Sequence, residues 1–308
     1  KELSVAVAAV DTDVIPAELV PLSTSAELLR RAGFGSAQDT SVKRNLALLL
    51  ANLMGWQRIV FLDDDIDVPD HRDLGRAAHL VSQYDAVGLS IGEFPDNSVV
   101  CHAHRATGGD QRTFIGGGAL AIGPKLMSSF FPNIYNEDWF FLLDGHRLCS
   151  ATAVGLAVQR RYDPYATQLR AESEEFGDSL AEGVFALLDQ QHSVDDAIAE
   201  GYWENYLDVR RAFIEDVIRR VETDEGLVDR SRMVRALNAA RERSRLIEPR
   251  LCVAYLEAWR ADREQWREHV KTHQARLSWP SQRGGARLEK VLSELGLLAY
   301  SGYVTPAG

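Results

Sequence analysis

The chain has 308 residues and a formal net charge of −11, with 45% hydrophobic and 26% charged residues. Such a composition is typical of a globular protein that can bury a full core, as one large domain or two smaller ones. The negative charge disfavours a nucleic-acid polymer or an anionic membrane as the main partner, although a nucleotide needs only a local cation. The three widely spaced cysteines predict neither a disulfide framework nor a zinc site, and they indicate a reduced setting.

The apolar stretch from Ala47 to Met54 is too short to span a membrane and lies close to Lys43 and Arg44. No secretory signal opens the chain, and because the first residue is Lys1 and not Met, we expect that residues upstream have been removed. We therefore expect a cytoplasmic protein without a membrane span.

Helical and extended patterns alternate through the first half of the chain, which predicts an α/β fold. In chain order we expect a strand or helix end at 3–10, a strand at 19–22 before a Ser-Thr-Ser turn, a helix at 42–56 and a strand at 59–62. A helix at 72–82 and strands at 85–91 and 98–104 should follow. We then expect a glycine turn at 116–118 leading into a short strand, a helix opening at 135–143 and a strand at 152–159.

From about residue 165 the pattern becomes amphipathic and helical. We expect packed helices at 178–190, 194–222, 228–245 and 247–273, then a short helix at 287–295 and an irregular end. The preceding segment 171–178 indicates helix capping around Gly177 and Asp178, and we assign it no chemistry.

Four aspartates, Asp63, Asp64, Asp65 and Asp67, directly follow the apolar strand 59–62. They repel one another unless a cation or solvent compensates their charge. Hard cations such as Mg²⁺ take oxygen ligands, commonly one or two carboxylates plus substrate phosphates. Ligands of open α/β sheets bind beyond the carboxyl ends of the strands, so this position suits a metal and nucleotide site better than a solvated turn.

Four motifs then occur in order: Lys43-Arg44-Asn45, the aspartate cluster, the glycine turn 116–118 and Asn136-Glu137-Asp138. Together they resemble the nucleotide-diphospho-sugar transferases of the GT-A fold, the family-2-like glycosyltransferases. The resemblance covers roughly residues 1–165 and implies a Rossmann-like GT-A domain that binds a nucleotide-sugar. Residues 166–308 would form a helical region that shapes the acceptor site or a homodimer interface.

Carried over by position, the resemblance implies that Asp65 coordinates Mg²⁺ or Mn²⁺ on the donor diphosphate. Asp63 or Asp64 would contact the ribose or a metal-bound water. Arg44, with Lys43 as its neighbour, would reach the nucleotide. Family frequency favours a UDP-sugar with a glucose-like sugar over a GDP-sugar.

The same resemblance assigns the acceptor side of the reaction. Gly116, Gly117 and Gly118 would let the sugar and acceptor approach the backbone, because glycine has no obstructing side chain. Asp138 would take the proton of the acceptor hydroxyl as general base, with Glu137 as a helper. The acceptor would be small and soluble, such as a secondary metabolite, a nucleoside or a glycerate derivative.

The chain departs from the family pattern in two places. The usual first strand is not evident, which agrees with residues missing upstream of Lys1. Retaining relatives that make glycerate glycosides place a metal-binding histidine after the strand that here ends at Arg160 to Asp163. Either Asp163 or water completes the metal shell, or the enzyme is inverting, which we prefer.

Three other interpretations remain open at the sequence level. A haloacid dehalogenase-like phosphatase would use Asp63 or Asp65 as nucleophile, but its motif is expected near the start of the domain and its later lysine and acidic pair are not evident. A non-catalytic sugar-binding module would leave Asp138 replaceable. His102 and His104 would share one face of a strand, as a satisfied or acceptor-contacting pair more readily than as zinc ligands.

Overall fold

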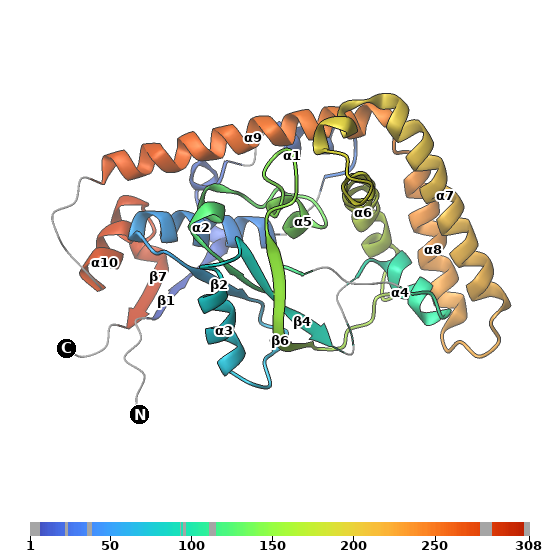
Figure 1. Cartoon of the computed structure of the whole chain (residues 1–308), viewed down its shortest axis with the longest axis horizontal. Coiled ribbons are helices and arrows are strands. Elements are labelled where there is room, and N and C mark those ends of the chain that lie inside the picture. The colour runs from blue at the N-terminus through green and yellow to red at the C-terminus, as the bar shows by residue number, and fades with distance from the viewer. Residues whose placement is uncertain are drawn as a thin grey trace.

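The computed structural model describes residues 7–21, 24–35, 39–92, 94, 97–110, 115–277 and 285–304. Five strands form a mixed sheet in the order β2-β5-β4-β6-β3, with helices packed around it (Figure 1). These strands are β2 (Ile59–Leu62), β3 (Ile66–Asp67), β4 (Ala86–Gly92), β5 (Ala119–Ile122) and β6 (Ala151–Gln159). The prediction of an α/β fold is confirmed at the level of a mixed α/β architecture.

The strand directions gather several chain segments at one edge of the sheet. β5 runs antiparallel to β2 and to β4, whereas β6 runs parallel to β4. β2, β4 and β6 therefore end at the edge where β5 begins, which we call the carboxyl edge. The register pairs Leu62 with Ala119 and Ile66 with Gln159, so the residues that follow β2 lie beside those that precede β5.

Both faces of the sheet are covered. In β5, Leu120 and Ile122 belong to the main hydrophobic core, whereas Ala119 and Ala121 belong to a smaller core against α3 (Arg72–Leu80). Successive side chains of a strand point to opposite faces, so a strand that is apolar at every position requires packing on both sides.

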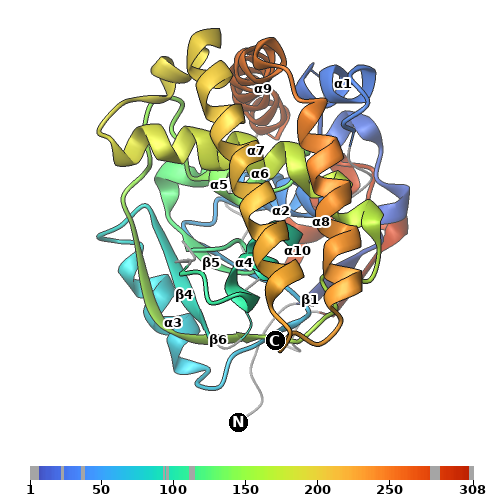
Figure 2. The same ribbon diagram turned by 90° about the vertical axis from the view of Figure 1, so that its right-hand side faces the viewer.

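The helices of the first half are α1 (Thr24–Arg31), α2 (Thr40–Met54), α3, α4 (Val99–Ala106) and α5 (Glu137–Phe141). Those that follow are α6 (Gln168–Asp189), α7 (Glu200–Thr223), α8 (Arg230–Arg245), α9 (Pro249–Arg276) and α10 (Gly285–Glu294). In Figure 1, α9 runs along the long axis of the molecule, from α10 to the far end where α7 and α8 lie. Figure 2 shows α7 and α8 side by side, and α8 also contacts α6.

Helix α2 agrees with its prediction and carries Arg44, the positively charged residue of the candidate site. Four of its five leucines are buried, and it ends at Gly55, which adopts the left-handed φ of 68° and donates its N–H to the carbonyls of Ala51 and Asn52. Asn45 anchors the other end, since its Nδ2 donates to the carbonyl of Phe131 at 2.7 Å and its Oδ1 accepts from Phe131 N–H at 2.8 Å. The side chain of Arg44 is thereby held toward the carboxyl edge.

The main core spans both sides of residue 165. Leu49 of α2, Phe140 of α5 and Trp259 of α9 all belong to it and are fully buried. The rings of Phe140 and Trp259 pack edge to face, with centroids 5.3 Å apart. The predicted boundary at residue 165 therefore does not separate two hydrophobic cores.

The strand predicted at 98–104 is wrong, because this segment forms helix α4. Ser98 caps the helix by accepting from Cys101 N–H at 3.2 Å, and Val99, Val100 and Ala103 are buried in a core shared with α7 and α8. Since the chain is helical here, the two histidines do not share a strand face. Packing against distant helices decides the structure of this segment.

The strand predicted at 19–22 is also wrong for the residues that the structure describes. A short 3₁₀ helix covers Ala17–Leu19, and Leu22 lies outside the described residues. The expected turn instead begins α1, where Asp262 of α9 accepts from the N–H groups of Thr24 and Ser25 at 3.1 and 2.9 Å. A carboxylate more than 230 positions away caps this helix, so no local signal could reveal it.

The chain ends differ from the prediction as well. β1 (Val7–Val10) pairs antiparallel with β7 (Ser301–Val304), where the sequence predicted an irregular end. The two strands form a separate sheet and add nothing to the five-stranded one. None of the helices in the described part of the chain combines the length and apolar character that crossing a membrane requires.

Candidate active site

A cavity of about 130 Å³ lies at the carboxyl edge of the sheet. Eight of the residues predicted for the site line it: Arg44, Asp63, Asp65, Gly116, Gly117, Gly118, Glu137 and Asp138. They come from α2, the end of β2, the turn before β5 and the start of α5. Four segments that are far apart in the sequence therefore meet at one place.

The aspartates after β2 divide between the cavity and the surface. Asp63 begins a tight turn, with its N–H bonded to the Gly118 carbonyl at 2.9 Å and its own carbonyl accepting from Ile66 at 3.2 Å. This turn brings Asp63 and Asp65 to the cavity, whereas Asp64 is exposed outside it. Asp67 forms an exposed ion pair with Arg160 at 3.2 Å.

Arg44 lies at the centre of the charged groups and is only 7% exposed. Its Nη2 donates to Asp63 Oδ2 at 2.7 Å and its Nη1 to Glu137 Oε1 at 2.5 Å. Arg44 thus joins the end of β2 to the start of α5. Lys43 lies elsewhere, in a half-exposed ion pair with Asp39 at 2.7 Å, and does not line the cavity.

The position of the Arg44 side chain requires a glycine at residue 117. A Cβ atom built on Gly117 would lie 2.3 Å from Arg44 Nη1, far inside van der Waals contact. The same Cβ on Gly116 would meet only Asp138 Oδ2, at 3.6 Å. Close approach of the backbone was expected at this turn, but the group that approaches Gly117 belongs to the protein itself.

Asp138 is held over the glycine turn. Its Oδ2 accepts from Gly117 N–H at 2.6 Å and its Oδ1 accepts from Trp139 N–H at 2.9 Å. These two bonds fix the orientation of the carboxylate at the cavity wall. Asn136 precedes the pair in the left-handed conformation, with φ of 62°, a conformation that Asn tolerates better than most residues.

Glu137 is buried next to one cation and two acids. Burial, together with Asp138 and Asp63 nearby, raises the pKa of Glu137 to about 7 against the opposing effect of Arg44. Near neutral pH this carboxyl group is therefore partly protonated, and the charge balance around Arg44 depends on its protonation state.

The donor set of the cavity fits a hard divalent cation. Gln159 Nε2 donates to Asp65 Oδ2 at 2.5 Å, and Arg44 occupies Oδ2 of Asp63. Across the described ranges, Oδ1 of each aspartate accepts no hydrogen bond, so two carboxylate oxygens are open to a ligand. The lining holds six carboxylates but, among its described residues, Arg44 as its one lysine or arginine, and Mg²⁺ or Mn²⁺ prefers oxygen ligands of this kind.

The structure does not bring Asp163 to the cavity. Its carboxylate forms an ion pair with Arg232 of α8 and accepts from Tyr165 N–H at 2.9 Å. The side chain that supports Asp65 is that of Gln159, the last residue of β6. Gln159 was not among the predicted site residues, although its register opposite Ile66 follows from the pairing of β3 with β6.

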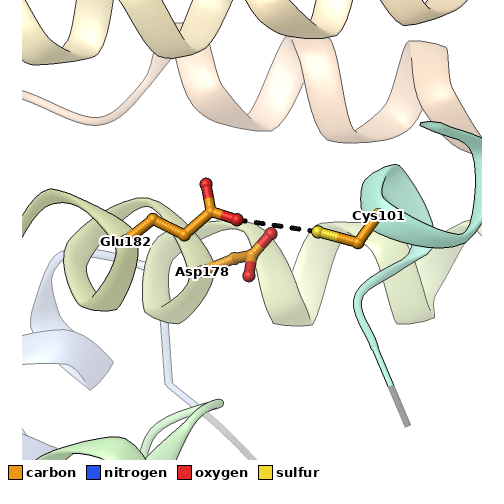
Figure 3. A group of neighbouring side chains, drawn as sticks. All are labelled: Cys101, Asp178 and Glu182. Atoms are coloured by element: carbon orange, nitrogen blue, oxygen red, sulfur yellow. Dashed lines mark hydrogen bonds between the residues drawn. The ribbon is translucent and has the colours of Figure 1, made fainter. Parts of the chain in front are cut away.

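A second group of acids on α6 was also missed. Asp178 and Glu182 line the cavity together with Cys101 of α4, and the ligand atoms of these three residues lie within 4.8 Å of one another (Figure 3). The segment 171–178 was predicted to cap a helix, but it lies inside α6, and Asp178 accepts from Asn136 Nδ2 at 3.2 Å.

Arg210 of α7 forms ion pairs with three acidic residues of α6. It is 2% exposed and donates to Glu175 at 2.9 and 3.0 Å, to Asp178 at 2.6 Å and to Glu182 at 2.7 Å. The spacing Glu175, Asp178, Glu182 follows the i, i+3, i+7 pattern of one helix face. That pattern is the signal by which the sequence could have revealed this group.

His102 and His104 lie on α4 with different surroundings. His102 Nε2 lies 2.8 Å from Tyr162 Oη and its ring stacks on Phe94 at 4.9 Å. Burial lowers the pKa of His102 to about 4, so the imidazole is neutral at pH 7. His104 instead packs edge to face against Phe213 of α7, with centroids 5.0 Å apart.

Comparison with known proteins identifies no relative: no family model, no curated protein and no solved structure matches this chain. The function must therefore be argued from the residues and their geometry.

Proposed function

We propose that the chain is a metal-dependent glycosyltransferase of the GT-A type, which moves a glucose-like sugar from a nucleotide-sugar to a hydroxyl group of a small acceptor. The single observation that supports it best is the meeting of Asp63, Asp65, Arg44 and Asp138 around one cavity. Each of these residues was expected to serve the donor or the acceptor, and they come from three separate segments of the chain.

On this proposal, Asp63 and Asp65 would be the residues that hold Mg²⁺ or Mn²⁺. When bound, the metal would neutralise the charge that develops on the departing nucleoside diphosphate. Arg44 keeps Asp63 in place and would supply a positive charge to the diphosphate. Gln159 orients Asp65 through its 2.5 Å hydrogen bond.

Asp138 acts as the general base of an inverting transfer. The acceptor oxygen forms a bond to the anomeric carbon while the bond from that carbon to the diphosphate oxygen breaks, and the electron pair leaves with the diphosphate. The acceptor proton passes to Asp138, whose carboxylate is oriented by Gly117 N–H. Glu137 serves as the partner of Arg44, and a proton on Glu137 would free Arg44 to turn toward the diphosphate.

The phosphatase alternative has less support. It needs a lysine near the nucleophilic aspartate, and none of the described lining residues is a lysine. A UDP-sugar remains our first choice of donor, and the acceptor side is considered further below.

The test is a thermal-shift panel of UDP, GDP, dTDP and a phosphosugar, each with and without Mn²⁺. We expect a nucleotide to raise the melting temperature only with Mn²⁺, and we expect this shift to disappear in Asp65→Asn. Asp64→Asn is the matched control, because Asp64 lies next in the chain but outside the cavity. Stabilisation by the phosphosugar alone, or equal loss in both variants, would contradict the proposal.

A second arm separates binding from chemistry. Asp138→Asn should lower transfer by about 10²-fold or more while leaving the Mn²⁺-dependent nucleotide shift unchanged. Transfer that survives this change would remove Asp138 from the role of base. The anomeric configuration of the product then distinguishes inversion from retention.

A further inference from the structure

A second cavity, of about 320 Å³, lies on the far side of the α6 acids. Its walls come from α4, α6 and α7, and it is lined by Cys101, His104, Asp110, Glu182, Tyr206, Val209, Arg210 and Phe213. Val209 is 65% exposed, so this cavity opens to solvent. Its volume is sufficient for a small ring compound.

Two side chains separate this cavity from the candidate active site. Cys101 and Glu182 line both cavities, and Cys101 Sγ donates to Glu182 Oε1 at 3.6 Å (Figure 3). A molecule in the second cavity therefore touches the wall of the cavity that contains Asp138. For a hydroxyl group of that molecule to reach Asp138, the side chains of Cys101 and Glu182 must move apart.

The wall between the cavities is acidic, and burial raises the pKa of Glu182 to about 7, so its carboxyl group is largely ionised at about pH 8. Glu175, Asp178 and Glu182 share one guanidinium, that of Arg210. Among the described residues, Oε1 of Glu182 accepts from the thiol of Cys101 alone, and a thiol is a weak donor. The Glu182 side chain is 27% exposed, so a stronger donor from a ligand can reach it.

The remaining lining favours a ring next to a cation. Tyr206, Phe213 and His104 present aromatic side chains, and Asp110 adds a further carboxylate at an exposed position. Aromatic faces attract cations as well as apolar surface. An anionic ligand would meet the carboxylates and be repelled.

A metal ion fits the same wall less well. Arg210 already donates to Asp178 and Glu182 at 2.6 and 2.7 Å, so its positive charge lies where a metal would bind. Burial next to these acids raises the pKa of the Cys101 thiol well above its usual range, which disfavours the thiolate that a metal needs.

We infer that the second cavity binds the tail of the acceptor, and that this tail carries a ring and a protonated amine whose ammonium group hydrogen-bonds to Glu182. The inference rests on the proposed transferase function, because only a transferase would use the bound molecule as an acceptor. Binding of the molecule itself is measured without nucleotide.

Three phenols that differ only in the substituent opposite the phenolic hydroxyl test the inference. They are tyramine, which is cationic, tyrosol, which is neutral, and 4-hydroxyphenylacetate, which is anionic. Binding is measured by calorimetry at about pH 8, where the amine is protonated. Because a charge-assisted hydrogen bond is replaced by a neutral one, we expect tyramine to bind about tenfold or more tightly than tyrosol, and the anion to bind most weakly.

Glu182→Gln should remove the preference for tyramine, whereas Glu172→Gln, on the exposed face of the same helix, should keep it. Since Glu182 pairs with Arg210, the Gln variant is checked for its melting temperature. Val209→Lys is a second variant, at an exposed position, that adds a positive charge to the cavity and should also remove the preference.

Equal binding of the three phenols, or a preference that survives in both Glu182→Gln and Val209→Lys, would overturn the inference. Binding of Zn²⁺ that is lost in Cys101→Ser, without any amine preference, would overturn it in favour of a metal site. A tyramine preference without any Mn²⁺-dependent nucleotide shift would leave the amine site standing and remove the transferase proposal.

Discussion

Replacing Gly117 by alanine tests whether Arg44 organises the site. The new Cβ would lie 2.3 Å from Nη1 and 2.8 Å from Cζ of Arg44, so the guanidinium must move away from Asp63 and Glu137. Overpacking a buried position costs about 1–3 kcal/mol, and a weakened buried ion pair adds to it. We expect the free energy of unfolding to fall by about 2–4 kcal/mol.

Urea denaturation measures this change, and thermal denaturation should show a melting temperature lower by about 3–6 °C for a chain of this size. Gly116→Ala is the matched control, because its Cβ would meet its nearest neighbour at 3.6 Å and should change stability by less than about 0.5 kcal/mol. Gly117→Ala should also weaken Mn²⁺-dependent nucleotide binding. Equal stability of the two variants would refute the idea that Arg44 needs the space at Gly117.

Two further predictions concern stability. The pKa of Glu137 is raised to about 7 in the folded protein, so its contribution to folding is fully present below about pH 4.5 and is lost as the pH rises through 7. The free energy of unfolding should therefore fall between these pH values, and it should fall less in Glu137→Gln. Identical pH slopes in the two proteins would contradict this prediction. Asp262→Ala should cost about 1–2 kcal/mol in urea denaturation because Thr24 and Ser25 lose their cap, whereas Glu264→Ala, at an exposed position of the same helix, should cost less than about 0.5 kcal/mol.

The elements that the sequence predicted well are those whose own residues determine them. The helix at 42–56 and the strand at 59–62 have dense apolar patterns and a glycine at the helix end, and the structure has both within two residues. Segment 98–104 failed because Val99 and Val100 are β-branched and favour strands locally. Their burial against α7 and α8 decides in favour of helix.

The residues of the candidate site also differ in whether the local sequence or distant packing determines their position. Asp63 and Asp65 follow a strand directly, so their place at the carboxyl edge could be predicted from the sequence alone. The spacing of the acids on α6 can be read from the sequence, but their common partner Arg210 cannot, because it lies on another helix. Likewise, the contact between Arg44 and Gly117 depends on how α2 packs against the turn before β5.

The core shared by α2, α5 and α9 limits how the chain could be divided or recombined. Proteolysis between β6 and α6 should not release two stable fragments, since each would expose apolar surface that the other now covers. Exchange of the helical part for that of another protein would fail for the same reason. On the proposed function, a change of acceptor would therefore come from individual side chains on α4, α6 and α7, and not from recombination of domains.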